Sequence, residues 1–219
     1  MSPSRAATPM DRSRRRKASS AEPSGRPQII EAAIASILEV GYYRSSTNEI
    51  ARRANVSWGA LQYHFGTREA LLLAIVKEID RRFLEDVQST ELEGDTAEAR
   101  IASLYGFIRR QYGSPTFLVR LQIVLNLQHD PDTSGDVKTE LAEIAAQGVT
   151  PLRRLLREAI GGKPNKASVD ALFHSLRGFA ISQQLAQAVP IEGSGVSSPD
   201  AVKVFLRGVA LGVSDHTGS

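Results

Sequence analysis

Apolar residues recur at intervals of three and four along most of the chain after residue 25, which is the period of an amphipathic α-helix. No stretch alternates polar and apolar residues over the length of a strand. Pro27 suits the first turn of a helix and Gly41 suits its end, and the apolar face between them is formed by Ile30, Ile34, Ile37 and Leu38. The sequence therefore predicts an all-α fold whose first helix begins near Pro27.

Two short helices joined by a tight turn are predicted within residues 46–65. Ser46 and Glu49 have the spacing of a capping box at the start of the first of these helices. Asn55 readily takes the left-handed conformation that ends a helix. Ser57 caps the second helix, whose buried face is formed by Leu61 and Phe65. This pattern is a helix-turn-helix, in which exposed side chains of the second helix enter the DNA major groove.

Six further helices are predicted after this motif. The first is capped by Thr67 and extends to about Gln88, so that it joins the two halves of the molecule. Pro151 is expected to kink the helix in which it lies. Breaks rich in Gly, Pro and Asp separate the other helices, which are expected over residues 96–112, 115–130, 135–160, 167–189 and 199–213.

Several short motifs accompany the helix-turn-helix, namely Gly41-Tyr42-Tyr43, Ser46-Thr47, Ile50-Ala51, Leu61-Gln62-Tyr63-His64-Phe65 and Thr67-Arg68-Glu69-Ala70-Leu71. With them, the region from about Arg26 to Val76 resembles, without gaps, the amino-terminal domain of the tetracycline-repressor (TetR) family of transcriptional regulators. Family members usually carry Leu-Tyr-x-His-Phe, so Gln62 stands where a tyrosine would contact phosphate. They also often carry Gly in place of Asn55 and Ser-Lys in place of Thr67-Arg68.

Side chains that project away from the Leu61 and Phe65 face are the predicted DNA contacts. Phosphate contacts are expected from Thr47, Tyr63, His64 and Arg68, and base contacts from Asn48, Trp58 and Gln62. Arg52, Ser57 and Gly59 complete the predicted interface. The alternative interpretation is an ordinary helix pair in which Trp58 and Tyr63 belong to the core.

Positive charge is concentrated at the amino-terminal end of the chain. The 219 residues carry a net charge of +3, whereas residues 1–25, with six basic and two acidic residues, carry +4. This segment is poor in large apolar residues and is expected to be a disordered tail. Its basic run at residues 14–17 either contacts phosphates or the minor groove, or is only a solvated tail. Translation could also begin at Met10 instead of Met1.

Composition and motifs favour a binding protein over an enzyme. The chain has no cysteine, which excludes disulfides and thiolate ligands and fits a reducing cytoplasm. Its four histidines lack metal-ligand spacing, and no phosphate-binding or nucleophile-elbow motif is present. No signal peptide or membrane-spanning run is evident. We therefore expect no catalytic residue, metal or cofactor, while an all-α enzyme or a helical adaptor without DNA binding remain the alternatives.

The resemblance implies that the middle helices enclose a small-molecule pocket. The residues expected to line it are Tyr105, Phe107, Phe117, Leu121, Gln122, Leu125, Asn126, His129, His174 and Arg177. The alternative for each polar residue among them is that it faces solvent or satisfies a helix end. Residues 107–128 contain three arginines and no acidic residue, which favours a neutral or anionic lipophilic effector.

The last two predicted helices are expected to form a two-fold dimer. Their apolar faces are formed by Phe173, Leu176, Ala180, Val202, Phe205, Leu206 and Val209, and three glycines permit close approach. We therefore expect residues 1–25 to be a tail, 26–68 to bind DNA, and 69–219 to bind an effector and dimerise. The predicted function is a ligand-responsive, homodimeric, cytoplasmic repressor that binds a palindromic double-stranded operator and is released by a small molecule.

Overall fold

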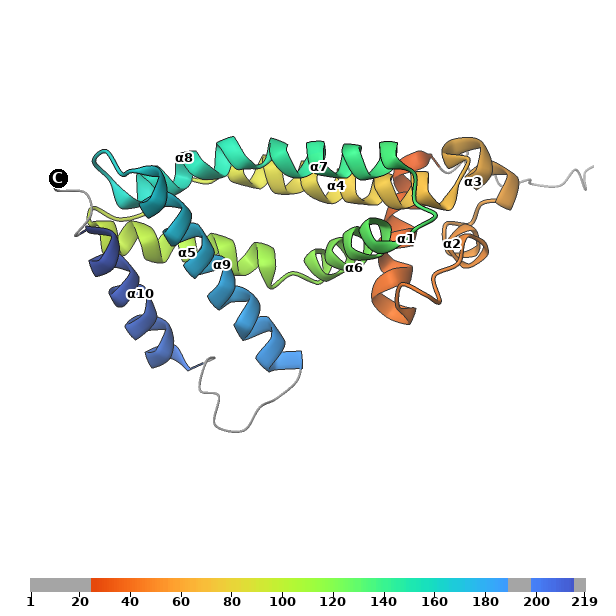
Figure 1. Ribbon diagram of the computed structural model, residues 1–219. Coiled ribbons are helices and arrows are strands. Elements are labelled where there is room, and N and C mark those ends of the chain that lie inside the picture. The colour runs from red at the N-terminus through yellow and green to blue at the C-terminus, as the bar shows by residue number, and fades with distance from the viewer. Residues whose placement is uncertain (1–24, 189–197, 215–219) are drawn as a thin grey trace, which may run out of the picture.

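The computed structural model describes residues 25–188 and 198–214, and the described residues are almost entirely helical, as predicted (Figure 1). Their helices are α1 (Arg26–Val40), α2 (Thr47–Arg53), α3 (Trp58–Phe65), α4 (Arg68–Ser89), α5 (Ala97–Tyr112), α6 (Pro115–His129), α7 (Gly135–Gln147), α8 (Val149–Ile160), α9 (Lys166–Ala188) and α10 (Pro199–Ser214). The predicted tail with its basic run at residues 14–17 and the predicted end of the 167–189 helix at Val189 lie outside the described residues.

Local hydrogen bonds explain where the first helices begin and end. The hydroxyl groups of Ser46, Ser57 and Thr67 each accept a hydrogen bond from the backbone N–H three residues later, which caps α2, α3 and α4. Asn55 has φ of +54°, the left-handed conformation expected at the turn. The capping box is only half formed, because the carboxylate of Glu49 pairs with Arg52 and Arg53 instead of returning to the N–H of Ser46.

The predicted kink at Pro151 is wrong, because the chain forms two helices that meet at Gly148. Pro151 lies in the first turn of α8, where a missing N–H leaves no intrahelical bond unmade. Its ring would have clashed with the carbonyl of Gln147 had the helix been continuous. The break therefore lies one turn before the proline.

Two hydrophobic clusters fill the interior. The first joins α1, α2 and α3 to the amino-terminal half of α4 and to α6 and α7, and it extends from Ile29 to Ile144. The second joins the carboxy-terminal part of α4 to α5, α8, α9 and α10, and it extends from Val87 to Ala210. In Figure 1, α4 runs the length of the molecule, with α1–α3 at one end and α9 and α10 at the other. α4 therefore contributes to both clusters.

No helix in the described ranges combines the length and apolar character needed to span a bilayer.

Candidate functional site

The exposed face of α3 consists of large side chains that the fold leaves uncovered. Trp58 and Tyr63 are 56% and 87% exposed, whereas Leu61 and Phe65 on the opposite face are 2% and 7% exposed. The alternative in which Trp58 and Tyr63 belong to the core is therefore wrong. Other predicted contacts are also exposed, namely Asn48, Arg52, Ser57, Gly59 and Gln62. Thr47 and His64 are half-buried at the edge of this face.

A carboxylate clamp fixes the arginines of α2. Arg53 donates hydrogen bonds to Glu49 at 2.6 Å and to Glu39 at 2.5 Å, so it braces α2 against α1. Arg52 also donates to Glu49 but keeps 70% of its side chain exposed. The hydrogen bonds from Arg52 and Arg53 lower the pKa of Glu49 to about 2. Glu49 is therefore a carboxylate at neutral pH, and Arg52 is held at the surface beside α3.

Arg68 is half-buried at the start of α4 and bonds the segment between α1 and α2. Its guanidinium donates hydrogen bonds to the carbonyl oxygens of Ser45, at 2.9 Å, and Tyr42, at 3.1 Å, and it lies over the ring of Tyr42. These contacts hold the Arg68 side chain against the segment between α1 and α2. The carbonyl oxygens of this segment lie outside a helix, so they are available to accept hydrogen bonds from Arg68. Arg68 therefore holds this segment, and its phosphate contact stays a prediction.

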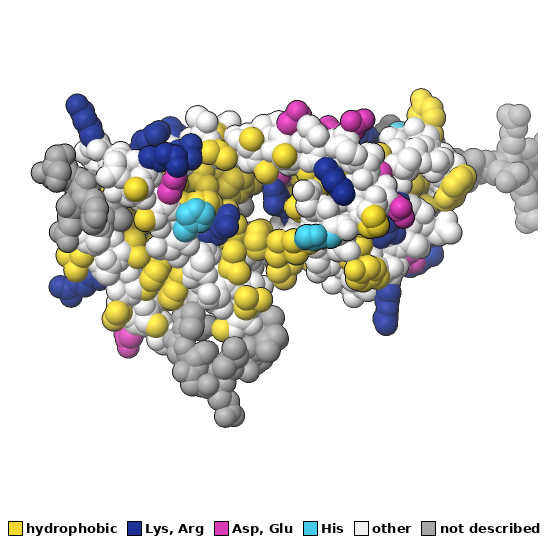
Figure 2. Space-filling model, viewed as in Figure 1, with side chains coloured by type: hydrophobic (Ala, Val, Ile, Leu, Met, Phe, Trp, Pro, Cys, Tyr) yellow, Lys and Arg dark blue, Asp and Glu magenta, His cyan; other side chains and the backbone are white. Residues whose placement is uncertain are grey.

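A cavity of about 920 Å³ lies between α4, α5, α6, α7, α8 and α9. Four of the predicted pocket residues line it, namely Phe117, Leu121, His174 and Arg177. Aromatic rings from α4, α5 and α9 complete its apolar wall, namely Phe83, Tyr112 and Phe173. The space-filling view shows an apolar recess below α8, with basic side chains and a histidine around it (Figure 2). Its volume is within the usual range for small-molecule sites.

Six of the predicted pocket residues lie elsewhere. Tyr105 and Phe107 are buried in the second hydrophobic cluster, because only the last turn of α5 reaches the cavity. Gln122, Leu125 and His129 are exposed, since the inward face of α6 beyond Leu121 packs on the first cluster instead. Asn126 accepts a hydrogen bond from the Tyr43 hydroxyl. Spacing identified helices near the cavity but not the faces that line it.

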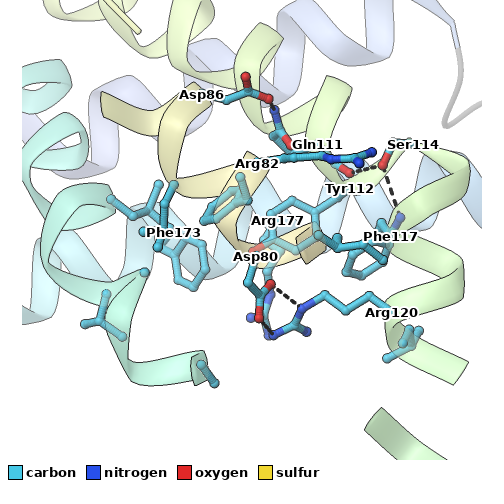
Figure 3. A pocket seen from close by; sticks show the side chains of 18 of the residues that line it. Asp80, Arg82, Asp86, Gln111, Tyr112, Ser114, Phe117, Arg120, Phe173 and Arg177 are labelled. Carbon is cyan, nitrogen blue, oxygen red and sulfur yellow. Dashed lines mark hydrogen bonds and ion pairs between the residues drawn. The ribbon is translucent and has the colours of Figure 1, made fainter. Parts of the chain in front are cut away.

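Acidic residues from α4 and α9 also line the cavity. The absence of acidic residues from residues 107–128 therefore does not describe the charge of the whole lining. Asp80 accepts two hydrogen bonds from Arg120, at 2.5 and 2.9 Å, and Asp86 accepts one from Gln111 at 2.8 Å (Figure 3). Asp170 lies 3.6 Å from Arg153. The sequence signal for Asp80 was its place on the apolar stripe of α4, one turn after Val76 and one before Phe83.

The residues predicted to form a dimer interface face the interior of their own chain. Leu176 and Ala180 are 0% and 2% exposed, and Phe205 stacks on Phe179 with ring centroids 4.1 Å apart. The partly buried Phe173, Val202, Leu206 and Val209 pack on the same second cluster. The apolar stripe of each helix is therefore used largely within the chain, and an interface formed by the partly buried residues stays a prediction. The outward faces of α9 and α10 carry other apolar residues, namely Leu185, Val204 and Leu211, which are 58%, 73% and 61% exposed.

Residues 29–75 match the model of the bacterial regulatory proteins of the tetR family. The fatty acid metabolism regulator protein of Bacillus subtilis is 35% identical over 75 residues, which are 34% of this chain and 39% of that protein. The HTH-type transcriptional regulator BetI of Cronobacter sakazakii is 27% identical over 196 residues, covering 78% of this chain and 96% of that protein. A crystal structure of the regulator FadR from Bacillus subtilis with stearoyl-CoA matches with a TM-score of 0.55 at 20% identity, covering 83% and 97% of the two chains.

Proposed function

We propose that this chain, which is a TetR-family transcriptional regulator, binds a palindromic operator as a homodimer, represses transcription there, and is released by a small lipophilic effector. The observation that carries this proposal is the capped helix α3, whose Trp58, Gln62 and Tyr63 remain exposed while Leu61 and Phe65 anchor it. Exposed aromatic and amide side chains on such a helix suit base edges and thymine methyl groups. We place this activity in the cytoplasm and assign no catalysis to the chain.

We propose that residues 26–68 bind DNA and that residues 69–219 bind the effector and form the dimer. α4 supports a link between them, since Arg68 at its first turn holds the segment before α2 and its second half, from Ile79 to Asp86, lines the cavity. An effector that binds one position of α4 better than another would change the spacing of the two reading helices in a dimer. DNA release would follow from that differential affinity.

Effector binding is supported by the size and lining of the cavity. A volume of about 920 Å³ with an aromatic wall is large enough for a drug-sized or acyl-chain ligand. The similarly folded FadR from Bacillus subtilis was crystallised with stearoyl-CoA, which gives an example of a lipophilic ligand in this architecture. We therefore propose that the cavity is the effector site of this chain.

The dimer is proposed to form through the outward faces of α9 and α10. Val204 and Leu211 lie on the outward face of α10, and Gly178 and Gly208 have open space where a Cβ would be. Apolar side chains beside small residues allow helices from two chains to pack closely as a four-helix bundle. A two-fold axis through this bundle would set the distance between the two copies of α3.

The test is recovery of genomic DNA fragments by the purified protein, compared with the double variant Trp58→Ala/Gln62→Ala. Gln128→Ala, an exposed change on α6, serves as the control. We expect the native protein and the control to enrich the same palindromic fragment, with affinity that falls steeply as salt rises, and the double variant to lose the enrichment. Equal enrichment by the double variant would contradict the assignment of α3 as the reading helix.

A further inference from the structure

Arg177 is held inside the cavity wall by two aromatic rings. Its guanidinium carbon lies 5.0 Å from the centroid of Phe173 and 5.9 Å from the centroid of Tyr112 (Figure 3). Cation–π contacts use the flat faces of a guanidinium, whereas its N–H donors lie in its plane. The two rings and a side-chain hydrogen bond to Tyr112 therefore fix the position of Arg177 without pairing its donors with a carboxylate.

Most of the arginines around the cavity lie close to a carboxylate, and Arg177 differs from them in this respect among the described residues. Arg120 pairs with Asp80, Arg82 pairs with Glu78 and Glu31, and Arg153 lies 3.6 Å from Asp170. Across the described ranges, no carboxylate lies within 4.0 Å of the Arg177 guanidinium. A half-buried cation without a counter-ion is costly unless a partner arrives from solution.

Both polar and apolar groups surround Arg177 in the cavity wall. Burial raises the pKa of Tyr112, although Arg177 opposes this effect, so the phenol is protonated at neutral pH and remains a hydrogen-bond donor. Phe117 lies against the Tyr112 ring with centroids 4.9 Å apart, and Leu121 and Leu152 extend the apolar wall. Among the described residues, the two lining arginines without a carboxylate within 4.0 Å are therefore Arg110, which is exposed, and Arg177, which is half-buried beside a neutral donor with hydrocarbon surface farther along.

We propose that Arg177 is the specificity-determining residue of the cavity and that the effector is an amphipathic monocarboxylate, whose carboxylate pairs with Arg177 while its apolar body lies against Phe117 and Leu121. This inference rests on the proposed function, since it names the ligand class of the same site. A guanidinium fork matches a carboxylate in a bidentate, charge-assisted geometry. A neutral ligand leaves Arg177 without a counter-ion, and a cationic ligand is repelled by it.

Three probes that share one chain length test the proposal, namely decanoate, 1-decanol and decyltrimethylammonium. Binding to the full chain is measured by calorimetry without DNA, below the concentration at which each probe forms micelles. We expect decanoate to bind at least about tenfold more tightly than decanol, and the cation to bind most weakly, which is the order that a charge-assisted contact gives. Equal affinity for acid and alcohol, or preference for the cation, would overturn the proposal.

Three variants separate the head-group contact from general packing. Arg177→Gln should weaken decanoate binding about tenfold and leave decanol binding unchanged, and Arg177→Lys should give an intermediate loss because it keeps the charge without the fork. Arg109→Gln, an exposed change on α5 outside the cavity, is the control and should alter nothing. If Arg177→Gln folds by circular dichroism and weakens acid and alcohol equally, Arg177 does not select the head group. If Arg177→Gln does not fold, two other measurements test the proposal. They are the affinity of the native protein for decanoate relative to decanol, and the loss of decanoate binding in Arg177→Lys.

Operator release is measured separately with the enriched genomic fragment. Decanoate binding through Arg177 without release would leave the ligand class standing and contradict the proposed effector function. Release by decanol and by decyltrimethylammonium as readily as by decanoate would support an effector site and overturn the assignment of a carboxylate ligand.

Discussion

The Tyr43 hydroxyl donates a hydrogen bond of 3.0 Å to Oδ1 of Asn126, which joins the segment after α1 to α6. The amide of Asn126 is oriented for this contact, because its Nδ2 donates to the carbonyl oxygen of Gln122 at 2.8 Å. Phe117 and Arg120, which line the cavity, lie on the same helix. The cavity is therefore connected to the helix-turn-helix through α6 as well as through α4.

The first prediction concerns this contact. Tyr43→Phe removes the hydrogen bond and keeps the ring, and because Tyr43 is 85% exposed, the free energy of unfolding should fall by no more than about 1 kcal/mol. The larger effect is expected on ligand-induced operator release, measured by fluorescence anisotropy of a labelled fragment. Tyr43→Phe and Asn126→Ala should each shift the ligand dose response, and the double variant should resemble either single variant. Additive shifts would show that the two residues act independently.

The second prediction separates two roles for Arg68. If Arg68 only holds the segment between α1 and α2, Arg68→Ala should lower the melting temperature and weaken DNA binding without changing the slope of affinity against salt. A direct phosphate contact would instead reduce that slope by about one. Arg52→Ala, which removes an exposed arginine of α2, is the comparison and should lower the slope. Binding isotherms at several salt concentrations distinguish the two outcomes.

The third prediction concerns base reading by α3. Gln62 is exposed and its amide Nε2 donates to the carbonyl oxygen of Gly66, a contact that it can exchange for a base edge. Gln62→Ala should lose about 1–3 kcal/mol of discrimination at one base pair of each half-site. Selection from a randomised operator library measures this preference. Tyr63→Phe should weaken binding to all sequences alike, and an unchanged library profile for Gln62→Ala would remove Gln62 from the base-reading set.

Local patterns were sufficient to predict the helix-turn-helix. The caps at Ser46, Ser57 and Thr67 each depend on a backbone N–H three residues away, and Asn55 determines its own left-handed conformation. The Leu61 and Phe65 pair then fixes which face of α3 is exposed. These signals lie within a few residues of the features they determine, so the sequence predicted the helix starts and the exposed residues of this motif.

Contacts between distant residues account for what local patterns did not predict. Arg68 bonds carbonyl oxygens 23 and 26 residues earlier, and the inward face of α6 is decided by its packing on α1 and α4. Helical periodicity identified an apolar stripe in α10 correctly but could not tell whether the stripe packs within the chain or against another chain. Phe205 packs within the chain, while its neighbour Val204 is exposed.

The fourth prediction concerns a buried hydroxyl outside the functional surfaces. Thr133, between α6 and α7, is 5% exposed, and its Oγ1 has no hydrogen-bond partner in the described part of the chain. Thr133→Val replaces this hydroxyl with a methyl group of similar size, so the free energy of unfolding should rise by about 1 kcal/mol. Urea denaturation measures the change. Thr133→Ser, which keeps the hydroxyl and loses the methyl, should be less stable than the native protein.

The last prediction tests the proposed dimer through two adjacent residues of α10. Val204 is 73% exposed, so Val204→Glu should leave the fold and the melting temperature of the isolated chain nearly unchanged but place charges between the two copies. Phe205 stacks on Phe179 within the chain, so Phe205→Glu should lower the free energy of unfolding by about 2 kcal/mol or more, whatever the oligomeric state.

Light scattering at micromolar concentration should give a dimer for the native chain and a monomer for Val204→Glu. Operator affinity should fall with dimerisation, because one copy of α3 reads only half of a palindrome. Lys203→Ala, which changes another exposed residue of α10, is the control and should remain a dimer. A dimeric Val204→Glu would place the interface elsewhere, and a monomeric native chain would contradict the dimer itself.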